Sequence, residues 1–258
     1  MRILFLNQSP RTPPGKPAPY DKEQVEDLLN SYASPGTSVE IGFPDDFDGS
    51  KVLEVIGEQK VLNGLHHAME VPAIVRKIAW AIQNGYDAVI QSNTFDPGVE
   101  QGRLIVRIPV IGLFKTSLHM GLTLADRIGI TVPLPSHVPY TWRILRAYEM
   151  DKYVTSIKSI GIYGTDIQTH KKEISKRMIE LIEESIGCGA EIILPLGGAL
   201  IPYVVDPMDL QEATGIQVLN TKAIGIRHAE TCVNIGLVHS TYTYPLASLS
   251  GMDLVSRS

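Results

Sequence analysis

Short apolar runs alternate with longer segments of helical periodicity along most of this chain, and this alternation limits most strongly how it can fold. Strands that are apolar on both faces are typical of parallel sheets covered by helices on both sides. The expected strands are Ile3–Leu6, Val39–Gly42, Ala88–Gln91, Val110–Leu113, Gly129–Thr131, Ile160–Tyr163, Glu191–Leu194 and Ile216–Val218. The pattern therefore predicts an α/β fold built on parallel sheets.

Apolar side chains at helical spacing mark several helices between these strands. Val25, Leu28, Leu29 and Tyr32 form one apolar face behind Asp21, which is placed to cap the helix. Two further helices carry apolar faces of the same kind, the first made by Ile74, Val75, Ile78, Ala79 and Ile82 and the second by Ile174, Met178, Leu181, Ile182 and Ser185. We expect Gly187 to end the second of these.

The chain also repeats one arrangement at low resolution. Gly85–Gln91 leads into the loop Ser92–Gly98, and Gly189–Leu194 leads into the loop Pro195–Leu200. Ligands of doubly wound sheets bind outside the carboxyl ends of the strands. We therefore expect two similar Rossmann-like (flavodoxin-like) domains related by a pseudo-dyad, with the active site in the cleft between them. The first would comprise residues 1–113 and 221–258, and the second residues 114–220.

Composition excludes several classes of partner. The chain has 258 residues, 44% of them hydrophobic, with a net charge of −5 and no basic run, so nucleic-acid binding is not expected. No apolar stretch reaches the roughly 18 residues of a membrane-spanning helix, and no signal-peptide pattern opens the chain. We expect a cytoplasmic protein with no membrane partner. Cys188 and Cys232 lack metal-ligand spacing, and we expect both to be buried small apolar residues.

Segments along nearly the whole chain carry a family resemblance. They are Met1–Asn7, Asp87–Val89, Asp96–Glu100, Pro109–Gly112, Ser117–His119, Arg127–Thr131, Gly236–Ser240 and Tyr244–Pro245. In order and spacing they resemble the aspartate/glutamate/hydantoin racemase superfamily, most closely its hydantoin and allantoin racemase branch. The resemblance implies a small-molecule substrate and, by analogy, a homo-oligomer.

The chain departs from this family at its catalytic positions. Members that racemise use two cysteines, one in each loop, on opposite faces of the substrate α-carbon. Here the first falls on Asn93, or on Ser92 in the register of the glutamate racemases, and the second falls on Gly197, or alternatively on Leu196. Asparagine and glycine cannot exchange protons at neutral pH, and serine needs an adjacent base. The two-thiol reaction is therefore disfavoured.

The groups expected to hold an anion are retained in both loops. Backbone N–H groups and small polar side chains are suited to bind a carboxylate or an enediolate. The superfamily also includes arylmalonate decarboxylases, in which glycine replaces one cysteine, and Thr94 and Gly198 resemble their anion-stabilising donors. The expected substrate-binding residues are Asn7, Ser9, Ser92, Asn93, Thr94, Gly197, Gly198 and Tyr242.

Four residues are candidates for moving protons. Asp96 and Glu100 are four apart and are expected on one helical face, although Asp96 is equally suited to cap that helix. His119 is a candidate acid or base whose alternative is a satisfied buried histidine, and His239 lies in a tail that could reach the cleft. The pair His66-His67 indicates a helix start rather than a metal site. No metal and no cofactor is expected.

These features favour a cofactor-independent enzyme that acts on a small carboxylate or cyclic amide through an enolate-like or tetrahedral anion. Lyase, decarboxylase, hydrolase or one-base isomerase chemistry fits the loops better than two-base racemisation. One alternative is a racemase or isomerase that uses Asp96, Glu100 or His239 in place of cysteine. A second alternative is a non-catalytic protein that binds small carboxylates.

Overall fold

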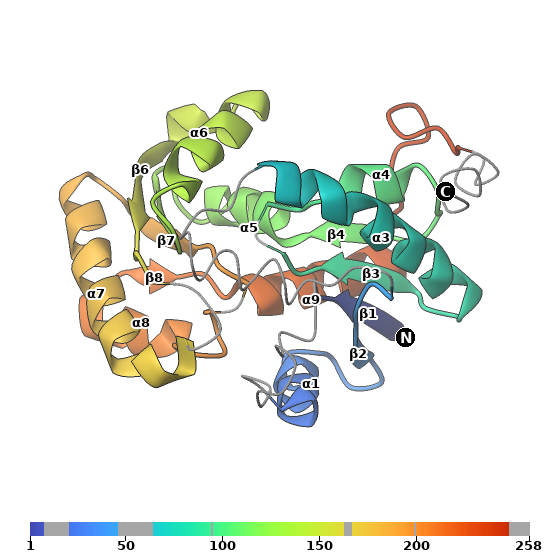
Figure 1. Cartoon of the computed structure of the whole chain (residues 1–258), viewed down its shortest axis with the longest axis horizontal. Helices are drawn as coiled ribbons and strands as arrows, with labels where there is room; N and C mark the ends of the chain where they lie inside the picture. The colour runs from blue at the N-terminus through green and yellow to red at the C-terminus, as the bar shows by residue number, and fades with distance from the viewer. Residues whose placement is uncertain (8–20, 46–63, 94, 163–166, 199, 248–258) are drawn as a thin grey trace.

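The computed structural model describes residues 1–7, 21–45, 64–93, 95–162, 167–198 and 200–247. Over these residues the chain forms two four-stranded sheets (Figure 1), with strand orders β2-β1-β3-β4 and β6-β5-β7-β8. The strands are β1 (Arg2–Leu6), β2 (Ser38–Gly42), β3 (Ala88–Gln91), β4 (Val110–Gly112), β5 (Ile128–Val132), β6 (Val154–Ser159), β7 (Ile192–Pro195) and β8 (Gln217–Val218). All neighbouring strands are parallel, which confirms the predicted α/β class.

Helices cover both faces of each sheet. On the first sheet, α1 (Lys22–Ser31) and α9 (Thr221–Asn234) pack on one face, and α3 (Gly64–Gln83) and α4 (Val99–Arg103) on the other. On the second sheet, α5 (Leu113–Leu122) and α6 (His137–Ala147) cover one face, and α7 (Lys171–Gly187) and α8 (Pro207–Thr214) the other. Two short 3₁₀ helices span Asp151–Tyr153 and Ile167–His170.

Strand β1 shows why the strands appear in the sequence as continuous runs of apolar residues. Ile3 and Phe5 face α1 and α9, whereas Leu4 and Leu6 face α3. Successive side chains of a strand point to opposite faces, so a strand covered on both sides needs apolar residues at every position. All four of these side chains are buried.

Two helices join the sheets. α5 and α9 lie side by side between them (Figure 1), and α9 also contacts β3 and β4. A Cβ at Gly225 of α9 would overlap the side chain of Leu113, so glycine permits this close approach. The chain therefore returns to the first sheet after completing the second.

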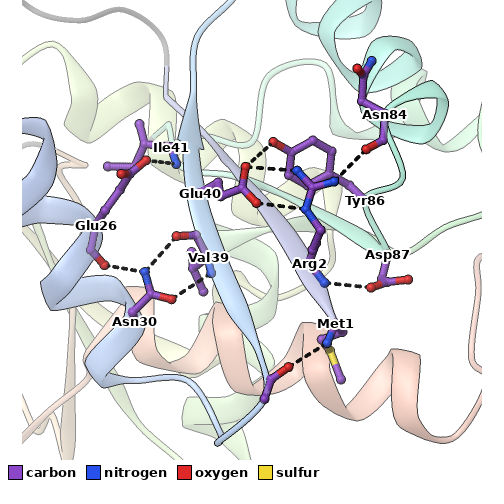
Figure 2. Close-up of polar contacts among 11 residues, drawn as sticks. Met1, Arg2, Glu26, Asn30, Val39, Glu40, Ile41, Asn84, Tyr86 and Asp87 are labelled. Carbon is purple, nitrogen blue, oxygen red and sulfur yellow. Dashed lines mark hydrogen bonds and ion pairs between the residues drawn. The ribbon is translucent and has the colours of Figure 1, made fainter.

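The amino edge of the first sheet is closed by a polar cluster (Figure 2). Arg2 donates hydrogen bonds to both carboxylate oxygens of Glu40, at 3.0 and 3.1 Å, and its guanidinium lies 4.4 Å from the ring centroid of Tyr86. The Tyr86 hydroxyl donates to Glu40 at 2.8 Å. Burial and the Glu40 carboxylate raise the pKa of Tyr86 to about 12. This cluster connects the start of β1 with the middle of β2 and with the turn before β3.

The sequence prediction was wrong at one strand. Ile160–Tyr163 was expected to form a strand, but β6 is the preceding segment Val154–Ser159. β6 lies at the edge of its sheet and contains several polar residues. It therefore lacks the continuous apolar run by which the other strands were recognised. Gly161 adopts a positive φ of 81°, which ends the extended conformation before Tyr163, a residue outside the described part of the chain.

No helix within the described residues is long and apolar enough to cross a membrane. The described ranges likewise contain no cluster of three or more His, Cys, Asp or Glu side chains arranged to hold a metal ion.

Candidate active site

The carboxyl ends of β1 and β3 are joined by polar contacts. The Ser92 hydroxyl donates a hydrogen bond to Asn7 Oδ1, and the Ser92 backbone N–H donates to the carbonyl of Leu6 at 3.0 Å. The backbone N–H of Asn93 donates to the side chain of Gln91. Ser92 and Asn93 are both buried. The structure therefore brings together three of the expected substrate-binding residues, Asn7, Ser92 and Asn93.

Glu70 lies at the same edge, although the sequence analysis did not single it out. Its side chain is 0% exposed, and Oε1 accepts a hydrogen bond from Asn93 Nδ2 at 3.0 Å. α3 runs antiparallel to the strands it connects, so its amino-terminal half returns to the carboxyl edge of the sheet. An acidic residue early in a helix that follows a strand is the signal that could have identified Glu70.

The second sheet carries the matching loop after β7. Leu196 donates its backbone N–H to the carbonyl of Thr131 at 2.8 Å, which holds the loop against the end of β5. Gly197 has a φ of 127°, and a Cβ there would lie 2.9 Å from Cγ of Pro133. Only glycine fits this backbone without strain. Gly197 and Gly198 are buried, so the loop presents backbone rather than side chains.

Phe95 connects the two edges. It belongs to the loop after β3 of the first sheet, yet its ring lies in the apolar core of the second sheet, in the cluster that also contains Leu196. Its ring centroid lies 5.2 Å from that of His137 and 4.8 Å from that of Tyr140, both at edge-to-face angles. His137 begins α6 and is 2% exposed. The sequence analysis missed His137 also, because only the fold places it beside the β3 loop.

Asp96 caps a helix, but not the expected one. Its Oδ1 and Oδ2 accept hydrogen bonds from the backbone N–H groups of Phe114 and Lys115, both at 2.9 Å, at the start of α5. Burial raises the pKa of Asp96 to about 6, even though these two donors and the nearby charges of Arg103 and Lys115 act in the opposite direction.

Asp96 and Glu100 therefore do not share a helical face. α4 begins only at Val99, and Asp96 precedes it with a positive φ of 53°. Glu100 is exposed. The expectation of a paired face was wrong because the loop turns sharply before the helix starts.

Glu100 and His119 line a cavity of about 740 Å³ between α4, α5, α6 and the C-terminal tail, together with Lys115, Arg143 and Tyr148 among others. The His119 ring lies with Nδ1 2.8 Å from the backbone carbonyl of Lys115, one helical turn earlier. His119 is exposed, which corrects its reading as a buried histidine.

His239 lies at the amino end of β4. Its Nε2 accepts a hydrogen bond from the backbone N–H of Val110 at 2.6 Å. Burial, with the charges of Arg103 and Arg107, lowers the pKa of His239 to about 4. Tyr242, in the same tail, is 95% exposed. Neither residue is brought to the strand-ending loops, and the two remaining candidates, Ser9 and Thr94, lie outside the described residues.

The two cysteines also lie away from both loops. Cys188 follows the last residue of α7 and is exposed, which corrects the expectation that it is buried. Cys232 lies on α9, half-buried, with Sγ 3.6 Å from Nε2 of His228.

Comparison with known proteins gives consistent matches. A family model described as Asp/Glu/Hydantoin racemase matches residues 64–229. A hydantoin racemase of Rhizobium meliloti is 26% identical over 186 residues, which cover 70% of this chain and 76% of that protein. Allantoin racemase from Pseudomonas fluorescens has a similar structure, with a TM-score of 0.80 at 20% identity over 96% of this chain and 97% of that chain. Unliganded arylmalonate decarboxylase has a TM-score of 0.56 at 13% identity over 90% and 92% of the two chains.

Proposed function

Because the chain belongs to the Asp/Glu/hydantoin racemase family, we propose that it is a cofactor-independent enzyme acting on a small carboxylate or cyclic amide. The reaction would pass through an enolate-like or tetrahedral anion held between the two strand-ending loops. The carboxylate or amide of the substrate would lie against Asn7, Ser92 and Asn93 on one side. The backbone of Gly197 and Gly198 would face it from the other.

The packing of Phe95 supports this proposal most directly. Phe95 lies two residues after Asn93 and shares a core cluster with Leu196, which precedes Gly197. Both loops therefore contribute a residue to one apolar wall. Buried polar groups beside such a wall are suited to stabilise an anion, because hydrogen bonds to charge are stronger where water is excluded.

The residues at these loops favour reactions that need one proton-transferring group. Lyase, decarboxylase, hydrolase and one-base isomerase chemistry each require an anion site and a single acid or base. The arylmalonate decarboxylase fold likeness is compatible with this range.

A racemase or isomerase without catalytic cysteines is the second candidate. It is favoured by the relatives named hydantoin racemase, and by the placement of two titratable side chains around one loop. Glu70 contacts Asn93 from the first sheet, and His137 contacts Phe95 from the second. Inversion needs two such groups on opposite faces of the α-carbon.

A panel assay in D₂O tests the proposal. The wild-type protein is incubated with single enantiomers of 5-methylhydantoin and allantoin, and with phenylmalonate. Proton NMR follows deuterium uptake at the α-carbon, polarimetry follows inversion, and headspace analysis follows carbon dioxide. We expect turnover of at least one probe. Binding of several probes with no exchange, inversion, ring opening or carbon dioxide release would instead identify a binding protein.

A further inference from the structure

We propose that the cavity between α4, α5, α6 and the C-terminal tail is a second ligand site, for an amino acid that carries a free carboxylate, a free ammonium group and a large apolar side chain. The cavity has a volume of about 740 Å³, and sites for small molecules usually have about 300–1,000 Å³. Its described lining residues include none from the loops of Asn93 and Gly197. The site is therefore distinct from the proposed anion site and does not depend on the function proposed above.

Two basic side chains line the cavity from two helices. Lys115 lies on α5 and Arg143 on α6. Lys115 Nζ lies 4.8 Å from the ring centroid of Tyr148, and Arg143 Cζ lies 4.8 Å from that of Tyr140. Neither basic group forms a salt bridge with a side chain in the described part of the chain. Both are therefore available to donate charge-assisted hydrogen bonds to a ligand carboxylate.

Two carboxylates line the same cavity, Glu100 on α4 and Glu149 after α6. Neither has a salt-bridge partner among the described residues. Burial, with the nearby charges of Asp96 and Glu100, raises the pKa of Tyr148. Glu100 and Lys115 therefore both lie near Tyr148 without pairing with each other. A ligand with both charges satisfies both groups, because its ammonium group donates to Glu100 while its carboxylate accepts from Lys115.

Part of the cavity wall is apolar and aromatic. Ile144 and Ala147 line it from α6, and Tyr244 lines it from the C-terminal tail. Arg103 holds Tyr244 in place, because its Nη1 lies 3.2 Å from the Tyr244 hydroxyl, to which it donates a hydrogen bond, and its Cζ lies 5.4 Å from the ring centroid. These walls favour an apolar side chain on the ligand, and the volume of the cavity leaves room for an aromatic one.

Calorimetric titration of the full chain with three probes tests the charge requirement. L-Phenylalanine carries both charges, 3-phenylpropionate carries only the carboxylate, and 2-phenylethylamine carries only the ammonium group. We expect L-phenylalanine to bind at least about tenfold more tightly than either of the other two, because each of them lacks one charge-assisted contact. A singly charged probe that binds as tightly as L-phenylalanine, or an absence of L-phenylalanine binding, would overturn the proposal.

Substitutions in the cavity locate the bound ligand. The double variant Lys115→Met with Arg143→Met, and separately Glu100→Gln, should each weaken L-phenylalanine binding by at least about tenfold. E100Q changes an exposed side chain, so it provides the test if the double variant fails to fold. Arg146→Met is the matched control and should bind as the wild type does, since Arg146 is exposed on the same helix as Arg143 but does not line the cavity.

Gly197→Ala separates this site from the proposed anion site. It should leave L-phenylalanine binding within about twofold of the wild type, because Gly197 lies in the loop after β7 and does not line the cavity. Loss of binding in G197A, with normal binding in the cavity variants, would place the ligand between the strand-ending loops and overturn the proposal. A wild-type protein that turns over none of the hydantoin, allantoin or malonate probes would overturn the proposed function and leave this binding result unchanged.

Discussion

The ring of Phe95 lies edge-on to the imidazole of His137, with the two ring centroids 5.2 Å apart. Phe95 belongs to the loop after β3 of the first sheet, and His137 begins α6 beside the second. This contact places an aromatic residue of one loop inside the core of the other half of the molecule. The relative position of the two proposed anion-binding loops therefore depends on it.

Replacing Phe95 with alanine should destabilise the protein by about 3–5 kcal/mol, as expected for loss of a buried aromatic ring. Activity with the probe that the wild type turns over should also fall, because the β3 loop loses its anchor. Urea unfolding measures the stability. Tyr242→Ala is the control, since Tyr242 is 95% exposed and its loss should change stability by no more than about 0.5 kcal/mol. An F95A variant as stable as the wild type would show that this contact does not hold the loops.

Asp96 should make stability depend on pH between about 4 and 7. Its pKa is raised from 3.8 to about 6 in the folded protein, so the folded state holds this proton more tightly than the unfolded chain does. The resulting stabilisation is full below about pH 4 and is lost as the pH rises through 6.

Urea unfolding of the wild type and of Asp96→Asn at pH 4 and pH 7 measures this effect. Relative to D96N, the wild type should lose at most about 3 kcal/mol between the two pH values, at roughly 1.4 kcal/mol per pKa unit. The comparison cancels other titrating groups that the two proteins share. A difference that stays constant over this range would contradict the assigned environment of Asp96.

His239 should release the C-terminal tail in acid. Its pKa is lowered to about 4 by burial and two arginines, so its stabilising contribution is present above about pH 6.5 and is lost as the pH falls through 4. The protonated ring can no longer accept the Val110 hydrogen bond. Hydrogen exchange corrected for intrinsic rates should show loss of protection at the Val110 amide on acidification, while Val89, which donates to the carbonyl of Pro109, serves as the internal reference. Equal behaviour of the two amides would argue against this contact.

Gly197 should not tolerate a side chain. A Cβ would lie 2.9 Å from Cγ of Pro133, and the φ of 127° is strained for any other residue. Gly197→Ala should lower stability by about 1–3 kcal/mol and reduce turnover, because the loop must shift. Gly187→Ala is the matched control, since no atom lies within 4 Å of the added Cβ. Wild-type turnover in G197A would mean that the precise path of this loop does not matter.

The local pattern of apolar residues was sufficient to predict the parallel sheets and most of the strands. Helices cover both faces of a strand such as β1, so every position of the strand is apolar and the run can be recognised in the sequence. β6 was misplaced because an edge strand carries polar residues, and the following apolar residues Ile160 and Ile162 pack on the core without continuing it.

The site was harder to predict because its contacts join distant residues. A polar side chain can cap the helix that follows it or a helix further along the chain. Asp96 caps the further one, because it accepts a hydrogen bond from Phe114, 18 residues away. His137 has no motif around it, and Glu70 is marked only by its position early in a helix. The packing of α3 and α6 brings both residues to the β3 loop. Sequence identified the strand-ending loops, but not the side chains that the rest of the fold adds to them.

Independence from both thiols is tested most directly by the variant that lacks them. Cys188→Ser and Cys232→Ser are combined, and α-deuterium uptake is measured with the probe that the wild type turns over. If the chemistry takes place between the loops of Asn93 and Gly197, the double variant should exchange within about twofold of the wild-type rate, because neither cysteine lies on those loops. A loss of more than about tenfold in a folded double variant would contradict a thiol-free site.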